Sequence, residues 1–350
     1  MSEIKFTMAA RCEAAGRPNN EDNFQLTDNL AGGQWGFTTD NEVTLTEKGA
    51  LMVICDGMGG MKAGATASAL AVKTIKEWFA SDRLTPEIMA SEATILQHIE
   101  QAIIAADEAI KAAGRQNSEI AGMGSTVVMA WFVKNNVFIG WCGDSRAYRY
   151  NASTGLERLS KDHSYVQELV DSGKLSKELA FEHPDSNIIT RSLGDTRQTV
   201  LPDVNSFPLT NGDMILLCSD GLSGVLRDEE IESIMEANSG TIGNCRDALW
   251  NESEKVGWID NVTVALCRIE SGIESSERPG KTAETSSADN QFTATEANKR
   301  KPRIWLIFLI VLLLLGIAFE AGHFYLKGSL FTQPLIDKIQ QLIQQLIQHL

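Results

Sequence analysis

Four aspartates in this 350-residue chain follow directly on apolar runs that have the composition of buried strands. They are Asp56 in CDG, Asp144 in CGDS, Asp220 in CSDG and Asp260 in IDN. Each short Asp-containing turn, taken alone, is more typical of a loop than of a ligand. Four carboxylates that converge at one end of a sheet, however, cannot all ionise without a counter-cation. Because oxygen ligands without His or Cys suit hard cations, the pattern favours Mg²⁺ or Mn²⁺.

The stretch VICDGMGGMKAG, residues 53–64, could form a plain tight turn, a phosphate-binding loop or a metal site. A phosphate-binding loop needs GxxxxGK(S/T), and no Lys-Ser or Lys-Thr pair follows a suitable glycine here. The dinucleotide-binding pattern GxGxxG would need glycine at position 62, which is lysine. A glycine-rich turn with Asp56 at its start remains. Near the N-terminus, RPNNEDNF adds Arg17, Glu21 and Asp22.

Alternating strand and helix patterns over residues 1–270 must position these side chains. Apolar residues at i, i+3 and i+4 predict helices over 62–80 and 86–114. Since the predicted strands between 124 and 150 follow one another without a helix, an antiparallel meander is favoured there over βαβ units. The predicted strands cover residues 4–11, 50–55, 124–133, 136–142, 145–150, 213–219 and 261–269. We therefore expect one α+β domain.

The charge and the cysteines restrict the class of protein. The net charge is −15, and residues 1–270 hold 23 Lys and Arg against 39 Asp and Glu. Such an acidic domain argues against nucleic acid as a partner and suits cation binding. Six cysteines are scattered without a CxxC pair, several inside apolar runs, which indicates reduced, buried thiols. The N-terminus lacks the pattern of a signal peptide.

The last 80 residues differ from the rest. Residues 271–303 are rich in Ser, Thr, Glu and Ala and end in the basic cluster KRKPR, which is typical of a flexible linker. Sixteen uncharged residues from Ile304 to Phe319 follow, and the pattern predicts a transmembrane helix over 304–322. The basic flank places residues 1–270 in the cytoplasm, on a single-pass inner-membrane protein. The non-cytoplasmic tail, 323–350, ends in an amphipathic helix, 335–350, that could self-associate or lie on the outer leaflet.

Eight motifs in order give the chain a resemblance that covers about residues 5–270. It resembles the metal-dependent protein serine/threonine phosphatases of type 2C, the PPM family, and is closest to the bacterial branch. The resemblance implies a β-sandwich of two antiparallel sheets flanked by helix pairs. It also implies hydrolysis of phosphoserine and phosphothreonine on cytoplasmic proteins, opposing a bacterial Ser/Thr kinase, by a water that bridges two metal ions. The motifs are RPNNEDNF, VICDGMGG, GMGSTVV, GDSRAYRY, LSKDHS, ITRSLGD, LLCSDGL and DNVTVAL.

The resemblance implies ligands for two Mn²⁺ or Mg²⁺ ions. Matched position by position, Asp56 bridges the two ions, and Asp220 and Asp260 complete the shell of one. The carbonyl of Gly57 is a ligand of the other ion. Asp144, with Asp220, would help to bind a third and weaker ion.

The resemblance also implies catalytic roles near the N-terminus. Glu21 and Asp22 hold metal-bound waters, and Arg17 pairs with the substrate phosphate. Eukaryotic members commonly have a histidine directly after the Asp-Gly, as a proposed acid, and this chain has Met58 there. His163 in KDHS is a conceivable substitute, although a structural histidine that caps the next helix is favoured.

Residues 164–187 match the variable flap of the family, which contributes to substrate choice. A regulatory phosphatase acting on one phosphoserine partner, such as an anti-anti-sigma protein, is the alternative enzyme. A pseudophosphatase scaffold is the alternative without activity. Because the metal-binding acids Asp56, Asp220 and Asp260 are all present, the active enzyme is favoured.

Overall fold

The computed structural model describes residues 3–36, 42–257 and 259–273. Contacts divide the chain into Met1–Glu284 and Thr285–Leu350, and every described residue belongs to the first unit. The predicted linker beyond residue 273, the transmembrane helix 304–322 and the tail 323–350 with its helix 335–350 lie outside the described residues. Within the described residues, no helix combines the length and hydrophobicity needed to cross a bilayer.

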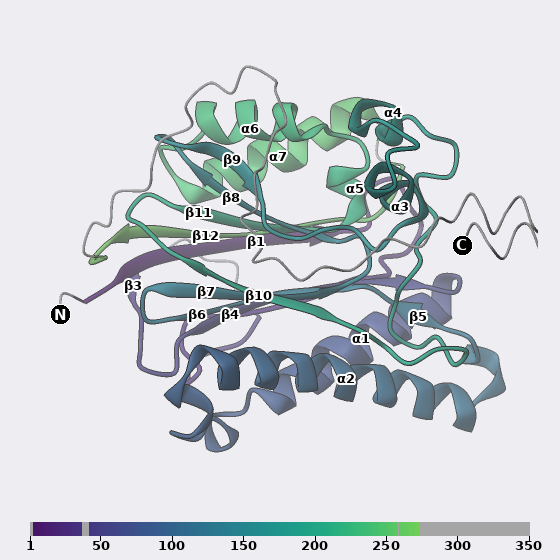
Figure 1. Ribbon diagram of the computed structural model, residues 1–350, viewed down its shortest axis with the longest axis horizontal. Helices are drawn as coiled ribbons and strands as arrows, with labels where there is room; N and C mark the ends of the chain where they lie inside the picture. The colour runs from purple at the N-terminus through teal and green to yellow at the C-terminus, as the bar shows by residue number, and fades with distance from the viewer. Residues whose placement is uncertain (1–2, 37–41, 258, 274–350) are drawn as a thin grey trace, which may run out of the picture. The chain divides into compact units, whose positions relative to one another are not determined.

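Two six-stranded sheets pack face to face (Figure 1), and every strand pairing in them is antiparallel. Sheet A has the order β3-β1-β12-β11-β8-β9, and sheet B has the order β10-β7-β6-β4-β2 with β5 paired to β4. The strands of sheet A are β1 (Lys5–Glu13), β3 (Val43–Thr44), β8 (Arg146–Asn151), β9 (Gly155–Arg158), β11 (Met214–Cys218) and β12 (Val262–Ser271). Those of sheet B are β2 (Asp22–Thr27), β4 (Ala50–Met58), β5 (Gly124–Ser125), β6 (Val127–Val133), β7 (Asn136–Cys142) and β10 (Asp203–Pro208).

A pair of helices covers the outer face of each sheet (Figure 1). Helices α1 (Met61–Trp78) and α2 (Glu92–Gln116) pack on sheet B, and α6 (Asp228–Ala237) and α7 (Ile242–Val256) pack on sheet A. The short helices are α3 (Tyr165–Asp171), α4 (Lys177–Phe181) and α5 (Asp220–Ser223), and the 3₁₀ turns are η1 (Ser81–Arg83), η2 (Ile88–Ala90) and η3 (Ser118–Ile120). The expected fold, two antiparallel sheets flanked by helix pairs, is confirmed.

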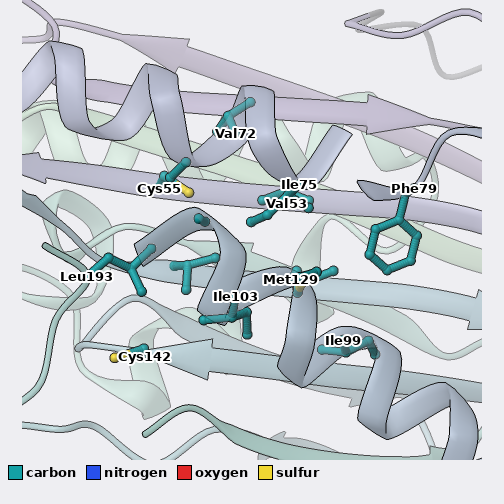
Figure 2. Close-up of a cluster of buried hydrophobic side chains, with 14 of the residues drawn as sticks. Val53, Cys55, Val72, Ile75, Phe79, Ile99, Ile103, Met129, Cys142 and Leu193 are labelled. Carbon is teal, nitrogen blue, oxygen red and sulfur yellow. The ribbon is translucent and has the colours of Figure 1, made fainter. Parts of the chain in front are cut away.

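The central strand β4 is buried on both faces. Met52 and Ile54 face the core between the two sheets, whereas Val53 and Cys55 face the core between sheet B and helices α1 and α2 (Figure 2). A third core joins sheet A to α6 and α7. Because successive side chains of a strand alternate, a strand between two cores is apolar at every position. This explains the uninterrupted run before Asp56.

Several predicted elements differ from those observed. Strand β4 runs through Asp56 to Met58, so Asp56 lies inside the strand and not after it. The predicted helix 86–114 begins at Glu92, because Ser91 caps it by accepting a hydrogen bond from the Thr94 N–H. Strands β2, β3, β9 and β10 and helices α3, α4, α5, α6 and α7 were not among the predicted elements. All six cysteines are free and five are buried, as expected.

Candidate metal centre

Strands β2 and β4 bring two of the predicted acids to the same end of sheet B. The strands pair antiparallel with Asp22 opposite Asp56. Leu26 in β2 and Ile54 in β4 belong to the core between the sheets. Since side chains alternate along a strand, Asp22 and Asp56 lie on that same inner face. Both carboxylates therefore point toward sheet A at the end of the sandwich.

Asp22 is buried and held from sheet A. The hydroxyls of Ser219 and Thr263 donate to its Oδ2 at 2.7 and 2.6 Å, and its Oδ1 has no hydrogen-bond partner. Burial raises the pKa of Asp22 to about 7. The two hydroxyls act in the opposite direction, and the charges of Asp220 and Asp260 raise the pKa further. Asp22 thus joins the two sheets through a carboxylate that is costly to ionise in isolation.

Asp56 and Asp220 are in direct contact. Asp220 opens α5 immediately after β11. Burial, followed by the charges of Asp220 and Asp22, raises the pKa of Asp56 well above its usual value. Burial and the charge of Asp260 also raise the pKa of Asp220. Thr126 fixes the backbone of Asp56, since its Oγ1 accepts from the Asp56 N–H at 3.0 Å and its N–H donates to the Asp56 carbonyl at 2.8 Å.

Asp144 lies in the turn between β7 and β8 and is buried. Its Oδ1 has no hydrogen-bond partner. Burial, then the charges of Asp220 and Asp162, raise its pKa well above the usual value. The adjacent Gly143 has a φ of +117° and donates its N–H to Nδ1 of His163 at 3.2 Å. The turn therefore holds Asp144 near Asp220.

Arg17 and Asp260 form the exposed rim of the acidic cluster. The Arg17 guanidinium donates to Asp260 Oδ2 at 2.7 Å and to the carbonyl of Ile259 at 2.8 Å. The side chains of Arg17 and Asp260 are 52% and 39% exposed, so solvent reaches this ion pair. The cation lies where a phosphate group could approach it, although in this structure its partner is a carboxylate.

Glu21 is positioned through Asn261. The buried Asn261 side chain accepts from the Glu21 N–H at 2.8 Å and donates to the carbonyls of Ala14 and Asn19 at 2.9 and 2.8 Å. These three bonds fold the segment between β1 and β2 against the start of β12. Burial and the charge of Asp260 raise the pKa of Glu21, and Arg17 lowers it.

Gly57 lies where three backbone segments cross. Its N–H donates to the carbonyl of Glu21 at 3.2 Å, and it pairs with Ser125 of β5. The hydroxyl of Ser68 in α1 also donates to the Glu21 carbonyl, at 2.5 Å. A Cβ at Gly57 would overlap the carbonyl group of Gly64. Only glycine allows this crossing.

The donor set fits a hard cation. Three buried carboxyl oxygens, Asp22 Oδ1, Asp144 Oδ1 and Asp220 Oδ1, have no hydrogen-bond partner. An unpartnered buried acceptor is costly, and a bound cation or a water held by one would satisfy such an oxygen. In the part of the chain that the structure describes, no three His, Cys, Asp or Glu side chains already surround one ion position. Asp260, one of the predicted ligands, is paired with Arg17 in this structure.

The structure assigns His163 a structural position. It is buried against Trp141, its Nδ1 accepts from the Gly143 N–H, and its Nε2 lies 3.4 Å from Asp203 Oδ2. The expectation that it caps the next helix is wrong, since Ser164 caps α3. Met58 is the last residue of β4.

The residues that hold the acids in place were missed by the sequence reasoning. They are Thr126, Ser219, Asn261 and Thr263, and each stands next to a predicted acid or lies in one of the eight motifs. A small polar residue inside an otherwise apolar run was the available signal. Two surface hollows, one over α1 and one between α2 and residues 196–199, are not lined by the acidic cluster.

Comparisons with known proteins identify the family of this chain. Residues 39–252 match the family model described as protein phosphatase 2C. The serine/threonine phosphatase stp of Listeria welshimeri is 34% identical over 216 residues, which cover 62% of this chain and 83% of that protein. The crystal structure of the serine/threonine phosphatase Stp1 from Staphylococcus aureus superposes with a TM-score of 0.62 at 32% identity, covering 75% of this chain and 95% of that one. The catalytic domain of the serine/threonine protein phosphatase PstP, solved in complex with two manganese ions, gives a TM-score of 0.61 at 28% identity, covering 77% of this chain and 100% of that one.

Proposed function

Since this chain belongs to the protein phosphatase 2C family and is a protein serine/threonine phosphatase, we propose that it removes phosphate from phosphoserine and phosphothreonine of cytoplasmic proteins with the help of two divalent cations, Mn²⁺ or Mg²⁺. It would act in opposition to a Ser/Thr kinase of the same cell. One observation carries the metal part of the proposal. The buried carboxylates of both sheets meet at one end of the sandwich with unpartnered oxygens and raised pKa values.

The residues that would hold the ions are those that the resemblance to the family implies. Asp56, Asp220, Asp260 and the carbonyl of Gly57 would hold the two ions. Asp144 would contribute to a third, weaker site. When bound, such ions neutralise charge on the phosphoryl oxygens and lower the pKa of water, so that hydroxide is available at neutral pH.

The remaining groups act on the substrate and on the geometry of the site. Arg17 would exchange Asp260 for the substrate phosphate, because a guanidinium matches two phosphate oxygens in a bidentate arrangement. Glu21 and Asp22 would fix waters around the ions through their oxygens. The half-exposed Arg17 at the rim suits a phosphorylated side chain carried on a protein surface.

The test measures phosphate release from a phosphothreonine peptide by the metal-free full chain. We expect turnover after addition of Mn²⁺ or Mg²⁺ and none in EDTA. Turnover that persists in EDTA would refute the metal mechanism. A chain that binds Mn²⁺ but releases no phosphate from phosphoserine or phosphothreonine would support the pseudophosphatase alternative.

We also propose that residues 304–322 anchor the enzyme in the inner membrane with residues 1–270 in the cytoplasm. The uncharged run from Ile304 to Phe319 and the basic cluster at 299–303 support this topology. Residues 271–303 would be the linker, and the tail 323–350 would lie outside and could associate with a second copy through 335–350. An alkaline phosphatase fusion after Leu350 should be active. A fusion that is active only when placed before residue 299 would overturn the topology.

A further inference from the structure

Gly64, in the first turns of α1, is a glycine whose backbone does not require glycine. It is not among the glycines with positive φ, and its position in the helix is one that alanine adopts readily. Glycine in a helix interior is less favourable than alanine, by the cost of its backbone entropy. Glycine is therefore required at position 64 by the lack of space around its Cα and not by the backbone conformation.

Two oxygens of the acidic site occupy that space. A Cβ on Gly64 would overlap Oε2 of Glu21 and would lie 2.9 Å from Cδ of Glu21 and 2.9 Å from the carbonyl oxygen of Gly57. These are the carboxylate and the carbonyl that the proposed function assigns to the ions and their waters. The bare Cα of Gly64 is thus one wall of the site.

The two groups that a Cβ on Gly64 would meet, the Glu21 carboxylate and the Gly57 carbonyl, differ in how freely they can move. The Glu21 backbone is held from three directions, by the Asn261 side chain, the Ser68 hydroxyl and the Gly57 N–H. The Glu21 carboxylate, in contrast, is the free end of a flexible side chain. Its clash with a new methyl group can be relieved by rotation, whereas the 2.9 Å contact with the carbonyl oxygen of Gly57 requires a local shift of the backbone.

Gly57 provides the contrast. A Cβ there would overlap the carbonyl carbon and oxygen of Gly64 and would lie 2.8 Å from the carbonyl oxygen of Glu21, so backbone surrounds it. Substitution of Gly57 should disturb the fold. Substitution of Gly64 should leave the fold intact and move the Glu21 carboxylate.

We propose that Gly64 is a positioning residue, whose missing side chain sets the place of the Glu21 carboxylate in the metal centre. This inference rests on the proposed metal centre. It makes the first turns of α1 part of the site, although Gly64 itself contributes no ligand.

The test compares Mn²⁺ affinity, measured by calorimetry on the metal-free full chain, with the urea midpoint in EDTA. Gly64→Ala should weaken Mn²⁺ binding by about 10- to 100-fold, the usual effect of disturbing groups that orient metal ligands. Its urea midpoint should fall less than that of Gly57→Ala, because a single backbone atom lies close to the new Cβ and alanine favours the helix. Gly114→Ala in α2 is the matched control, since a Cβ there meets nothing closer than 3.7 Å. That variant should bind Mn²⁺ as the wild type does.

A double-mutant cycle identifies the displaced group. In a Glu21→Ala background, Gly64→Ala should cost less than about threefold more in affinity, because no carboxylate remains to be moved. Combining Gly64→Ala with Glu21→Asp should recover part of the affinity, since the shorter side chain withdraws from the new methyl group.

Three outcomes would overturn the inference: a Gly64→Ala variant with wild-type affinity, an equal loss in the Glu21→Ala background, or unfolding of Gly64→Ala in EDTA. A wild-type chain that binds no Mn²⁺ would instead refute the metal centre itself.

Discussion

Replacing Asp22 by asparagine should stabilise the metal-free protein while impairing metal binding. Asp22 is buried, and its pKa is raised from 3.8 to about 7. Between about pH 4 and pH 7 the unfolded chain has already released this proton, whereas the folded protein retains it. The free energy of unfolding therefore falls as the pH rises through this range and levels off above about pH 7. At pH 8 the ionisation of buried Asp22 lowers the free energy of unfolding by about 4 kcal/mol, since each pH unit of the range contributes about 1.4 kcal/mol.

Asparagine removes the ionisation but not the burial. Its Oδ1 can still accept from Ser219 and Thr263, as Oδ2 of Asp22 does. Its amide nitrogen would replace Asp22 Oδ1, which has no partner, and an unsatisfied buried amide costs about 1–3 kcal/mol. The net gain for Asp22→Asn in EDTA at pH 8 is therefore about 1–3 kcal/mol, and it should shrink toward pH 5.

The assay is urea unfolding of the full chain in EDTA at pH 5, 6, 7 and 8, followed by tryptophan fluorescence. Asp82→Asn is the control, because it removes one negative charge at an exposed position and should change stability by less than about 0.5 kcal/mol. Adding Mn²⁺ should reverse the order of the wild type and Asp22→Asn. An Asp22→Asn variant that is no more stable than the wild type at pH 8, with the same dependence on pH, would refute the reasoning.

Three further predictions concern the rim of the site and its support. Asp260→Asn should lower kcat at saturating Mn²⁺ by at least ~100-fold, as loss of an electrostatic stabiliser does, and a near-wild-type kcat would show that Asp260 is not a ligand. Arg17→Lys should raise KM for a phosphothreonine peptide by about tenfold, because an ammonium cannot bind phosphate in a bidentate manner, and an unchanged KM would remove Arg17 from substrate binding. Asn261→Ala should lower the free energy of unfolding in urea by about 2–4 kcal/mol, since three hydrogen bonds of a buried side chain are lost, and a change below about 1 kcal/mol would contradict its role.

The parts of the fold that could be predicted from the sequence are those with one dominant local signal. Strand β4 was evident because both of its faces are buried, and α2 because its apolar residues follow the helical period. Strand β10 was missed because its residues are half-buried or exposed, and it ends in Pro208 at the edge of sheet B. Helix α6 was missed because charged residues fill its first turn. Both β10 and α6 form because distant segments of the chain pack against them, and a local sequence pattern does not contain that information.

The same distinction applies to the site. The acids could be predicted because each interrupts or follows an apolar run, where a carboxylate is rare unless it is paired with another group. Asn261 was missed because its function lies in bonds to Ala14, Asn19 and Glu21, more than 200 positions away in the sequence. The Arg17–Asp260 ion pair could not be predicted either, since sequence spacing does not show which carboxylate lies next to a surface arginine in the fold.

The position of Asp22 explains why the site and the core of this fold are linked. Ser219 and Thr263 reach across from sheet A to a carboxylate on sheet B, so the acidic end of the sandwich also holds the two sheets together. In the absence of a cation, the charges of Asp22, Asp56 and Asp220 oppose one another and weaken that junction. A bound cation would convert the repulsion into attraction, so that metal binding and sheet packing should stabilise each other. The metal-free protein is therefore less stable than it would be without these buried acids. The same mutual repulsion of the carboxylates favours binding of a cation.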